Sequence, residues 1–159
     1  MLPSCADELF MREAIREAQL AEAIGEVPVG AVIVCKGEII GRGHNRVIAD
    51  SDPSAHAEII ALREAGKMLC NYRLSDCQVF VTIEPCPMCA GALVHARMAR
   101  LVYGADDPKA GAVRSVLQVI NAPGLNHKME AVSGVLAAQC AELLQGFFRQ
   151  RREVNREDF

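Results

Sequence analysis

The sequence predicts an α/β protein, a three-layer α/β/α sandwich in which a mixed β-sheet lies between helices. Short β-branched runs alternate with segments of helical periodicity, and such strand–helix–strand units place parallel strands side by side beneath helices. Two early strands joined by a tight turn add an antiparallel hairpin, which makes the sheet mixed. Because 159 residues correspond to about one domain, we expect residues 1–159 to form a single domain.

The expected elements follow one another without a linker or an internal repeat. A first helix covers residues 6–24, where apolar side chains recur at helical spacing, and Gly25 follows as a stop signal. The hairpin joins strands at 29–35 and 38–47 through Lys36 and Gly37. We expect the other elements to be a helix at 55–69, a strand at 78–83, a helix at 85–96, a strand at 100–104, a short helix at 115–120, a strand at 130–134 and a helix at 135–152.

The composition indicates a globular protein with an aliphatic core. Hydrophobic residues make up 51% of the chain, charged residues 23% and aromatic residues only 4%, with no tryptophan. The net charge of −3 and the isoelectric point near 5.8 argue against broad, non-specific binding of nucleic acids. A local basic patch is sufficient to contact a few phosphates, so this composition leaves a nucleic-acid substrate open.

The cysteines indicate a reducing compartment. Their number, seven, is odd and rules out complete disulfide pairing within one chain. The first residues contain no apolar core of a secretory signal, and the longest apolar stretch, at 27–35, is far shorter than the ~20 residues that span a bilayer. We therefore expect a cytoplasmic protein without membrane association, in which clustered cysteines are metal ligands or core residues.

Two short segments carry the ligand types of a metal site: 56–58 (His-Ala-Glu) and 85–89 (Pro-Cys-Pro-Met-Cys). Cys86 and Cys89 are three residues apart at an expected helix start, where both thiols point the same way and the helix dipole favours thiolates. With His56 they supply three protein ligands, the number found in catalytic zinc sites that keep one position for water.

The remaining cysteines and histidines show no ligand-like spacing. A closed structural zinc site would need a fourth ligand, and the nearest candidates in sequence are Cys70, Cys77 and His95. We expect Cys35, Cys70, Cys77 and Cys140 to be core or inert thiols.

Glu58 follows His56 by two residues and is the expected catalytic group. Beside zinc-bound water, a carboxylate can take a proton as hydroxide attacks and return it to a leaving amine. The alternative is an acid that only stabilises the positive end of a helix dipole.

The pattern His-x-Glu followed by Pro-Cys-x-x-Cys resembles the signature of the zinc-dependent nucleobase deaminases. Over residues 10–152 the chain is further similar to the bacterial tRNA-specific adenosine deaminases, a branch of the cytidine deaminase superfamily. The zinc motifs identify only the superfamily. The segments that select the tRNA branch are 26–31, 43–45, 52–58, 71–74, 84–91, 104–112 and 123–127.

This resemblance implies a cytidine-deaminase-like fold with five strands and a homodimer whose sites lie near the subunit interface. It implies one Zn²⁺ per subunit and hydrolytic conversion of adenosine to inosine at the wobble position of a tRNA anticodon. Zinc-bound hydroxide would attack the base, with Glu58 as the proton shuttle. The residues implied to contact the nucleoside are Asn45 and the backbone of Ala57, with Val29, His56 and Pro85 lining the base pocket.

Two further segments are implied to contact the tRNA anticodon stem-loop. Asp107 and Lys109 match residues near the anticodon backbone, although without the resemblance they would be a solvated loop. The segment 147–152 (Phe-Phe-Arg-Gln-Arg-Arg) pairs aromatic with basic residues, as in proteins that hold unpaired RNA. The alternative is a plain helix that buries Leu143, Leu144 and Phe147. We expect this structural role for one of the two phenylalanines, whereas Phe148, Arg149 and Arg152 are expected to contact RNA.

Two other functions share part of this pattern. A deaminase of a free base or nucleoside would use the same zinc residues, and the acidic isoelectric point suits it, but it would not require the aromatic-basic helix end. A zinc-stabilised binding module would not explain an open three-ligand site next to a carboxylate.

Overall fold

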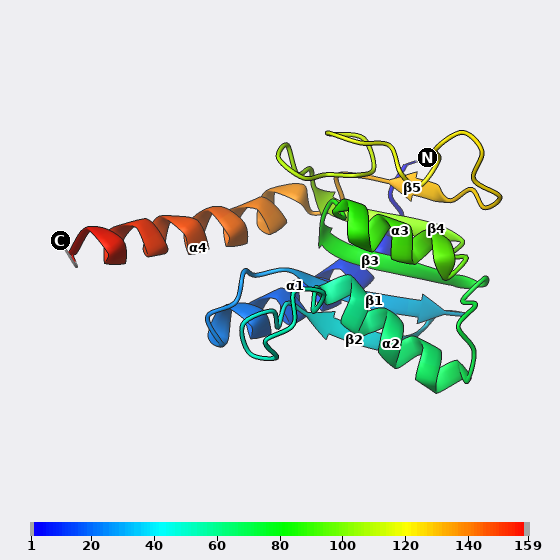
Figure 1. The fold of residues 1–159 in the computed structure, drawn as a ribbon, viewed down its shortest axis with the longest axis horizontal. Coiled ribbons are helices and arrows are strands. Elements are labelled where there is room, and N and C mark those ends of the chain that lie inside the picture. The colour runs from blue at the N-terminus through cyan, green and yellow to red at the C-terminus, as the bar shows by residue number, and fades with distance from the viewer. Residues whose placement is uncertain (1, 158–159) are drawn as a thin grey trace.

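The computed structural model describes residues 2–157 (Figure 1). In chain order these residues form α1 (Cys5–Ala23), β1 (Gly30–Cys35), β2 (Glu38–His44), α2 (Ala57–Leu69), β3 (Cys77–Ile83), α3 (Pro87–His95), β4 (Arg100–Ala105), β5 (Glu130–Val132) and α4 (Ala137–Glu157). Residues 1, 158 and 159 of the expected single domain lie outside the described residues.

The five strands form one mixed sheet in the order β2-β1-β3-β4-β5. β1 is antiparallel to both β2 and β3, whereas β3, β4 and β5 are parallel to one another. The β1–β2 pairing comes from the hairpin at Lys36 and Gly37, and the parallel pairing of β3 with β4 comes from a strand–helix–strand unit through α3. The connection from β4 to β5 contains no helix. The expectation of a five-stranded mixed sheet is therefore confirmed.

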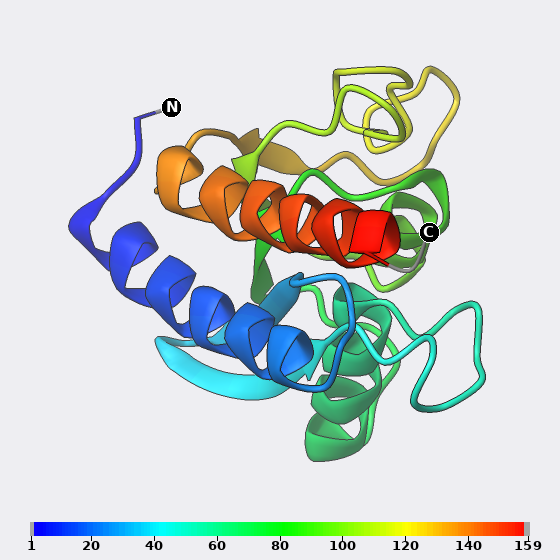
Figure 2. The ribbon, with the colours of Figure 1, turned by 90° about the vertical axis from the view of Figure 1, so that its left-hand side faces the viewer.

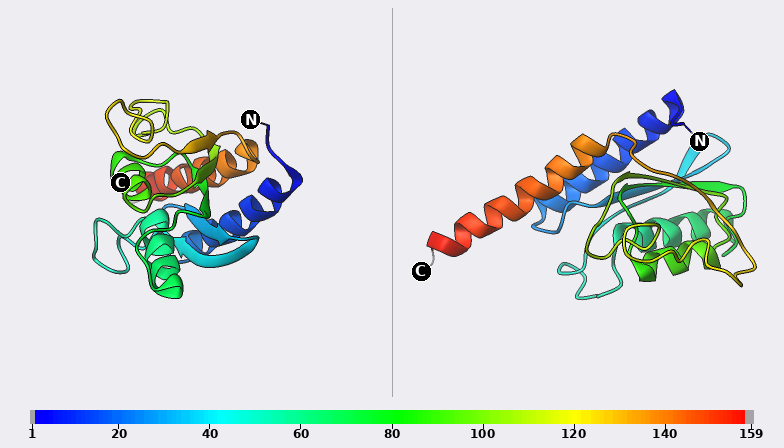
Figure 3. Two further views of the ribbon diagram at one scale, coloured as in Figure 1. Left: turned by 90° about the vertical axis from the view of Figure 1, so that its right-hand side faces the viewer. Right: turned by 90° about the horizontal axis from the view of Figure 1, so that it is seen from above.

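Helices cover both faces of this sheet, which confirms the three-layer arrangement. α1 and α4 lie next to each other on one face, and α2 and α3 lie on the other (Figures 2 and 3). The side chains buried beneath α1 and α4 include Met11, Ala14, Ile15, Val32, Val34, Phe80, Val102 and Cys140. Those buried beneath α2 and α3 include Ala31, Ile33, Ala57, Ala61, Ala65, Val79, Val81, Ala90, Leu93, Leu101 and Tyr103.

Small residues let α2 lie directly against β2. The buried face of the helix consists of Ala57, Ala61 and Ala65. Opposite them, a Cβ atom added at Gly43 would lie 2.3 Å from the Ala57 carbonyl oxygen, and one at Gly41 would lie 2.4 Å from that of Ala61. This close approach fixes the first turn of α2, and therefore the segment that carries His56 and Glu58, against the sheet.

The prediction of a short helix at residues 115–120 is wrong, because this segment consists of turns and irregular backbone. The Val119 N–H donates to the carbonyl oxygen of Ala112, seven residues earlier, whereas a helix requires a partner four residues earlier. Just before it, the N–H groups of Val113, Arg114 and Ser115 all donate to the buried carboxylate of Glu84. The backbone conformation here is thus determined by a carboxylate distant in sequence, and local periodicity cannot indicate that interaction.

α4 is longer than the expected helix at 135–152, and its C-terminal half extends beyond the sheet (Figure 1). Its exposed end is rich in charged side chains. Among residues 2–157, the structure has no helix with the length and apolarity needed to cross a membrane.

Candidate metal centre and adjoining cavity

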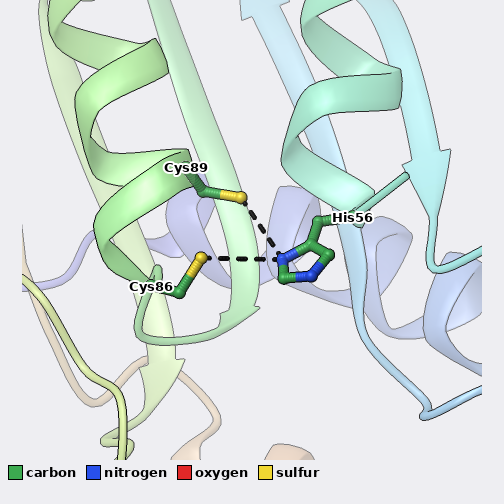
Figure 4. A group of neighbouring side chains, drawn as sticks. All are labelled: His56, Cys86 and Cys89. Atoms are coloured by element: carbon green, nitrogen blue, oxygen red, sulfur yellow. Dashed lines mark hydrogen bonds between the residues drawn. The ribbon is translucent and has the colours of Figure 1, made fainter. Parts of the chain in front are cut away.

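Three predicted ligands converge between the starts of α2 and α3 (Figure 4). His56 and Cys86 are the N-cap residues of these two helices, both with extended backbone, and Cys89 lies in the first turn of α3. The Nδ1 atom of His56 lies 3.6 Å from the Sγ atom of Cys86 and 3.5 Å from that of Cys89. The ligand atoms of all three residues lie within 4.8 Å of one another.

These distances fit a single four-coordinate metal ion. With a metal–nitrogen bond of about 2.0–2.1 Å and metal–sulfur bonds of about 2.3 Å, a tetrahedral centre holds the nitrogen and each sulfur roughly 3.6 Å apart. The structure has this separation for both pairs. The group His56, Cys86 and Cys89 is therefore positioned to bind a metal ion, with one tetrahedral position left for another ligand.

The surroundings favour a negatively charged sulfur at this centre. The hydrogen bond from the Cys89 thiol lowers the pKa of Cys86 to about 4, against the opposing effect of burial, and His56 adds to this lowering. The same contact, together with burial, raises the pKa of Cys89. The hydrogen bond with Cys86 also raises the pKa of His56. Hydrogen bonds thus link His56, Cys86 and Cys89, and a bound metal ion would take the place of the protons in these bonds.

Glu58 lies beside the metal ligands and is almost completely buried, with 2% of its surface exposed. Burial raises the pKa of its carboxyl to about 7, and the opposing effects of Cys89 and His56 do not offset it. A carboxyl group that exchanges its proton near neutral pH is suited to general acid–base chemistry.

A cavity of about 300 Å³ adjoins this centre. Its lining includes three residues of the centre itself, His56, Glu58 and Cys86. It also includes five other residues predicted from the sequence, which are Val29, Asn45, Asp107, Lys109 and Phe148, and Val27, Ile83 and Leu144 add apolar surface. An apolar cavity with a few polar groups is typical of a small-ligand site.

Asn45 and Ala57 act as a pair in this structure. The side-chain oxygen of Asn45 accepts a hydrogen bond of 3.0 Å from the Ala57 N–H. This bond orients Asn45 in the cavity and restrains the first residue of α2. Ala57 and Pro85 are buried next to the ligands and are not part of the cavity lining, so the structure places them behind it.

Asp107 and Lys109 lie on a loop at the edge of the cavity. The Asp107 carboxylate accepts hydrogen bonds from the backbone N–H groups of Lys109 and Ala110, at 3.0 and 3.2 Å. Asp107 therefore shapes the loop as well as lining the cavity, and its contact with an anticodon stays a prediction.

A groove of about 550 Å³ continues from the cavity along α4. Phe148, Arg149 and Arg152 line it, and Asp107 and Lys109 are shared with the cavity. Phe147 is 6% exposed and part of the core, whereas Phe148 is 46% exposed, so one phenylalanine is structural as expected. Arg151 points elsewhere, since it donates to the carbonyl oxygen of Gly25 and lies over the Phe147 ring.

Glu84 is a residue of the site that the sequence predictions do not include. Its buried carboxylate accepts hydrogen bonds from the N–H groups of Asp107, Val113, Arg114 and Ser115, and from the Ser115 hydroxyl. Burial opposes the charge, yet these bonds, led by the Ser115 hydroxyl, lower the pKa of Glu84 to about 2. The only sequence signal is an acidic residue at the end of an apolar strand, next to Pro85.

The fold and the centre define a deaminase. Residues 5–152 match the family of MafB19-like deaminases. Among solved structures, the guanine deaminase from Nitrosomonas europaea is 26% identical, with a TM-score of 0.77 over 92% of this chain and 86% of that chain.

Other relatives narrow the family further. The tRNA-specific adenosine deaminase of Haemophilus influenzae is 52% identical over 92% of this chain and 86% of its own length. A structure from a study of A-to-I editing by tRNA:A34 deaminases at the wobble position is 43% identical, with a TM-score of 0.83 over 86% of this chain and 99% of that chain. The chain belongs to the tRNA-specific adenosine deaminase family.

We predict that Glu84→Gln lowers the free energy of unfolding by about 1–3 kcal/mol, because an uncharged amide cannot accept all the hydrogen bonds that the carboxylate accepts. Hydrogen exchange should accelerate at residues 107–115. Asp106→Asn is the matched control, since its ion pair with Arg114 is exposed and is worth at most about 1 kcal/mol. Equal losses of stability in urea unfolding of the two variants would contradict the role assigned to Glu84.

Proposed function

We propose that this protein hydrolyses adenosine to inosine at the wobble position of a tRNA anticodon, with one zinc ion per subunit. The observation that carries the proposal is the continuity of three features. A three-ligand metal centre with an adjacent buried acid opens into a base-sized cavity, and the cavity continues into an aromatic and basic groove on α4. The names of the relatives support the same substrate.

The ligand set favours zinc. Two thiolates and one imidazole are the borderline-to-soft donors that zinc accepts, and the nitrogen–sulfur distances of 3.6 and 3.5 Å suit its bond lengths. The residues that would hold it are His56, Cys86 and Cys89. When bound, zinc supplies the activation of water for attack on a nucleobase.

The chain's own residues account for the other parts of the reaction. Deamination adds water at carbon-6 of adenine and releases ammonia, so a proton must move from the water to the departing nitrogen. Glu58 is placed to carry that proton, because it lies beside the ligands, is buried, and has a pKa near 7. Burial also excludes bulk water, which strengthens its interaction with the reacting atoms.

The cavity can hold a base that has been rotated out of its stack. Val29 supplies apolar surface for the ring, and Asn45 is held by the Ala57 N–H so that its amide group can bind the nucleoside. A base reaches such a pocket only if it is unpaired and flipped out, as it can be in an anticodon loop.

The groove on α4 supports a polynucleotide substrate over a free base. The whole chain is acidic, with a net charge of −3, yet Lys109, Arg149 and Arg152 gather along one groove with the half-exposed ring of Phe148. A free base held in the cavity would not reach Arg149 or Arg152, which line the groove and not the cavity. Aromatic stacking and phosphate pairing are how single-stranded RNA is held.

The same proposal includes a homodimer, a cytoplasmic location and a single deaminase domain over residues 1–159. The dimer rests on the family resemblance alone, and the domain is supported by relatives that match over most of the chain. The cysteine usage of the sequence supports the compartment.

The first test is inosine formation by the purified, zinc-loaded protein. The substrates are an anticodon stem-loop with adenosine at the wobble position and, in parallel, free adenosine, cytidine and guanine. We expect conversion of the stem-loop alone, because the groove adds binding that free bases lack. Conversion of only a free base or nucleoside would support the proposed deaminase chemistry but contradict the proposed tRNA substrate.

Glu58→Ala should retain the metal and lower the deamination rate by at least ~100-fold, the low end for general acid–base catalysis. Cys86→Ala serves as the contrasting variant, because removing a ligand should lower metal content as well as rate. Metal analysis and single-turnover kinetics separate the two effects. Normal turnover by Glu58→Ala, or full metal content in Cys86→Ala, would contradict the assigned role.

The double variant Arg149→Ala/Arg152→Ala should weaken stem-loop binding and reduce the slope of log affinity against log salt by up to about 2, because two phosphate contacts are lost. Metal content should not change. Arg12→Ala/Arg63→Ala is the control, since it removes the same charge at two exposed arginines that do not line the groove. If both double variants bind alike across the salt series, the end of α4 has no role in RNA binding.

A further inference from the structure

Two cysteines outside the metal centre face each other across the sheet. Cys35 is the last residue of β1 and Cys77 is the first residue of β3, and the antiparallel register pairs them directly. Cys77 belongs to the core beneath α2 and α3 and Cys35 packs against this core, so their side chains lie on the same face. Neither residue lines the cavity or the groove described above.

The backbone hydrogen bonds show which kind of antiparallel pair this is. The Cys77 N–H donates to the carbonyl oxygen of Leu74, and the Cys77 carbonyl oxygen accepts from the N–H of Ala99, each at 3.0 Å. The N–H and carbonyl groups of Cys77 therefore point away from β1, and Cys35 and Cys77 form a pair without backbone hydrogen bonds between them. In such pairs the Cα atoms are only about 4.5 Å apart and the side chains are at their closest.

This spacing is compatible with a covalent link. A disulfide requires Cα atoms about 4.4–6.8 Å apart, so the pair lies at the short end of that range without any movement of the strands. The thiols already interact: burial and then the hydrogen bond with Cys35 raise the pKa of the Cys77 thiol to about 12. A link at the short limit of the range is expected to be reducible.

Access to the pair comes from one side. Cys35 is partly exposed and precedes the exposed turn residues Lys36 and Gly37, whereas Cys77 is only 1% exposed. A small oxidant can therefore reach Cys35 first, and Cys77 can then react from within the fold without entering solvent.

We propose that Cys35 and Cys77 form a reversible intramolecular disulfide when the protein meets a small-molecule disulfide. The Cys35 sulfur, as thiolate, attacks one sulfur of the oxidant and releases one small thiol. The Cys77 sulfur loses its proton and attacks the Cys35 sulfur, which releases the second small thiol. The two protein thiols are oxidised by two electrons, and the oxidant is reduced to two thiols.

The link would stabilise the fold and spare the site. It would close the loop of residues 36–76, which contains β2 and α2, and so restrict the unfolded chain. Cys35 lies five residues beyond Gly30, or roughly 16 Å along β1 from the end next to Val29 of the cavity. We therefore expect a higher thermal midpoint and unchanged deamination.

The test uses the zinc-loaded protein, so that Cys86 and Cys89 are held as ligands, incubated for hours with oxidised glutathione. Remaining thiols are alkylated in denaturant, and peptides are mapped by mass spectrometry before and after reduction. Cys35→Ala removes the pair. Cys140→Ala is the matched control, because it removes a buried thiol on α4, outside the β1–β3 pair.

We expect a Cys35–Cys77 peptide in the unaltered protein and in Cys140→Ala, with a rise of the thermal midpoint of about 5–10 °C that dithiothreitol reverses. Cys35→Ala should show neither. A stable glutathione adduct on Cys35 with Cys77 still free would overturn the proposal. So would a linked protein that melts at a lower temperature, since the link would then require distortion of the native fold.

Discussion

The convergence of two helix N-termini on one point is the constraint on which the rest of this molecule depends. His56 and Cys86 are the N-caps of α2 and α3, where a side chain stands at the end of the helix and the backbone dipole favours negative charge. Their donor atoms meet at 3.6 Å because α2 lies on β2 through alanines and glycines, with no larger side chain between them. A bulkier residue at Gly43 would move the first turn of α2 and separate the ligands before any chemistry could occur.

A second carboxylate connects this centre to the loop at the edge of the cavity. Glu84 leads from β3 into the Pro85–Cys86 segment, and its buried oxygens hold the backbone of the loop that carries Asp107. Gly111 allows the approach, since a Cβ atom there would lie 2.3 Å from the Glu84 carboxylate. The ligand segment and the edge of the cavity are therefore tied together through Glu84. Glu58 and Glu84 are both buried acids, but only Glu84 is surrounded by donors, so their pKa values shift in opposite directions.

The sequence predicts those features whose cause is local, and its predictions fail where the cause is distant. The ligand triad is readable because Cys86 and Cys89 share one helical turn and His56 starts another helix, and the mixed sheet follows from a hairpin and strand–helix–strand units. The false helix at 115–120 has apolar periodicity, but its preceding N–H groups bind a carboxylate about 30 residues away. The same long separation hides Glu84. Facing thiols at Cys35 and Cys77 depend on strand register, which neither segment reveals alone.

Substrate choice in this fold rests on what surrounds the centre. The guanine deaminase shares the architecture at 26% identity, so the sheet and the two converging helices do not determine which base is accepted. In this chain the cavity beside the centre continues into a longer groove along α4. Phe147 anchors the helix in the core, and the next residue, Phe148, lines both the cavity and the groove. Because consecutive residues on a helix point about 100° apart, one phenylalanine of this pair is buried in the core while the other faces the cavity and the groove. The chain as a whole is acidic, yet Lys109, Arg149 and Arg152 lie along this groove, so under the proposed function affinity for RNA and access to the cavity would depend on the same few side chains.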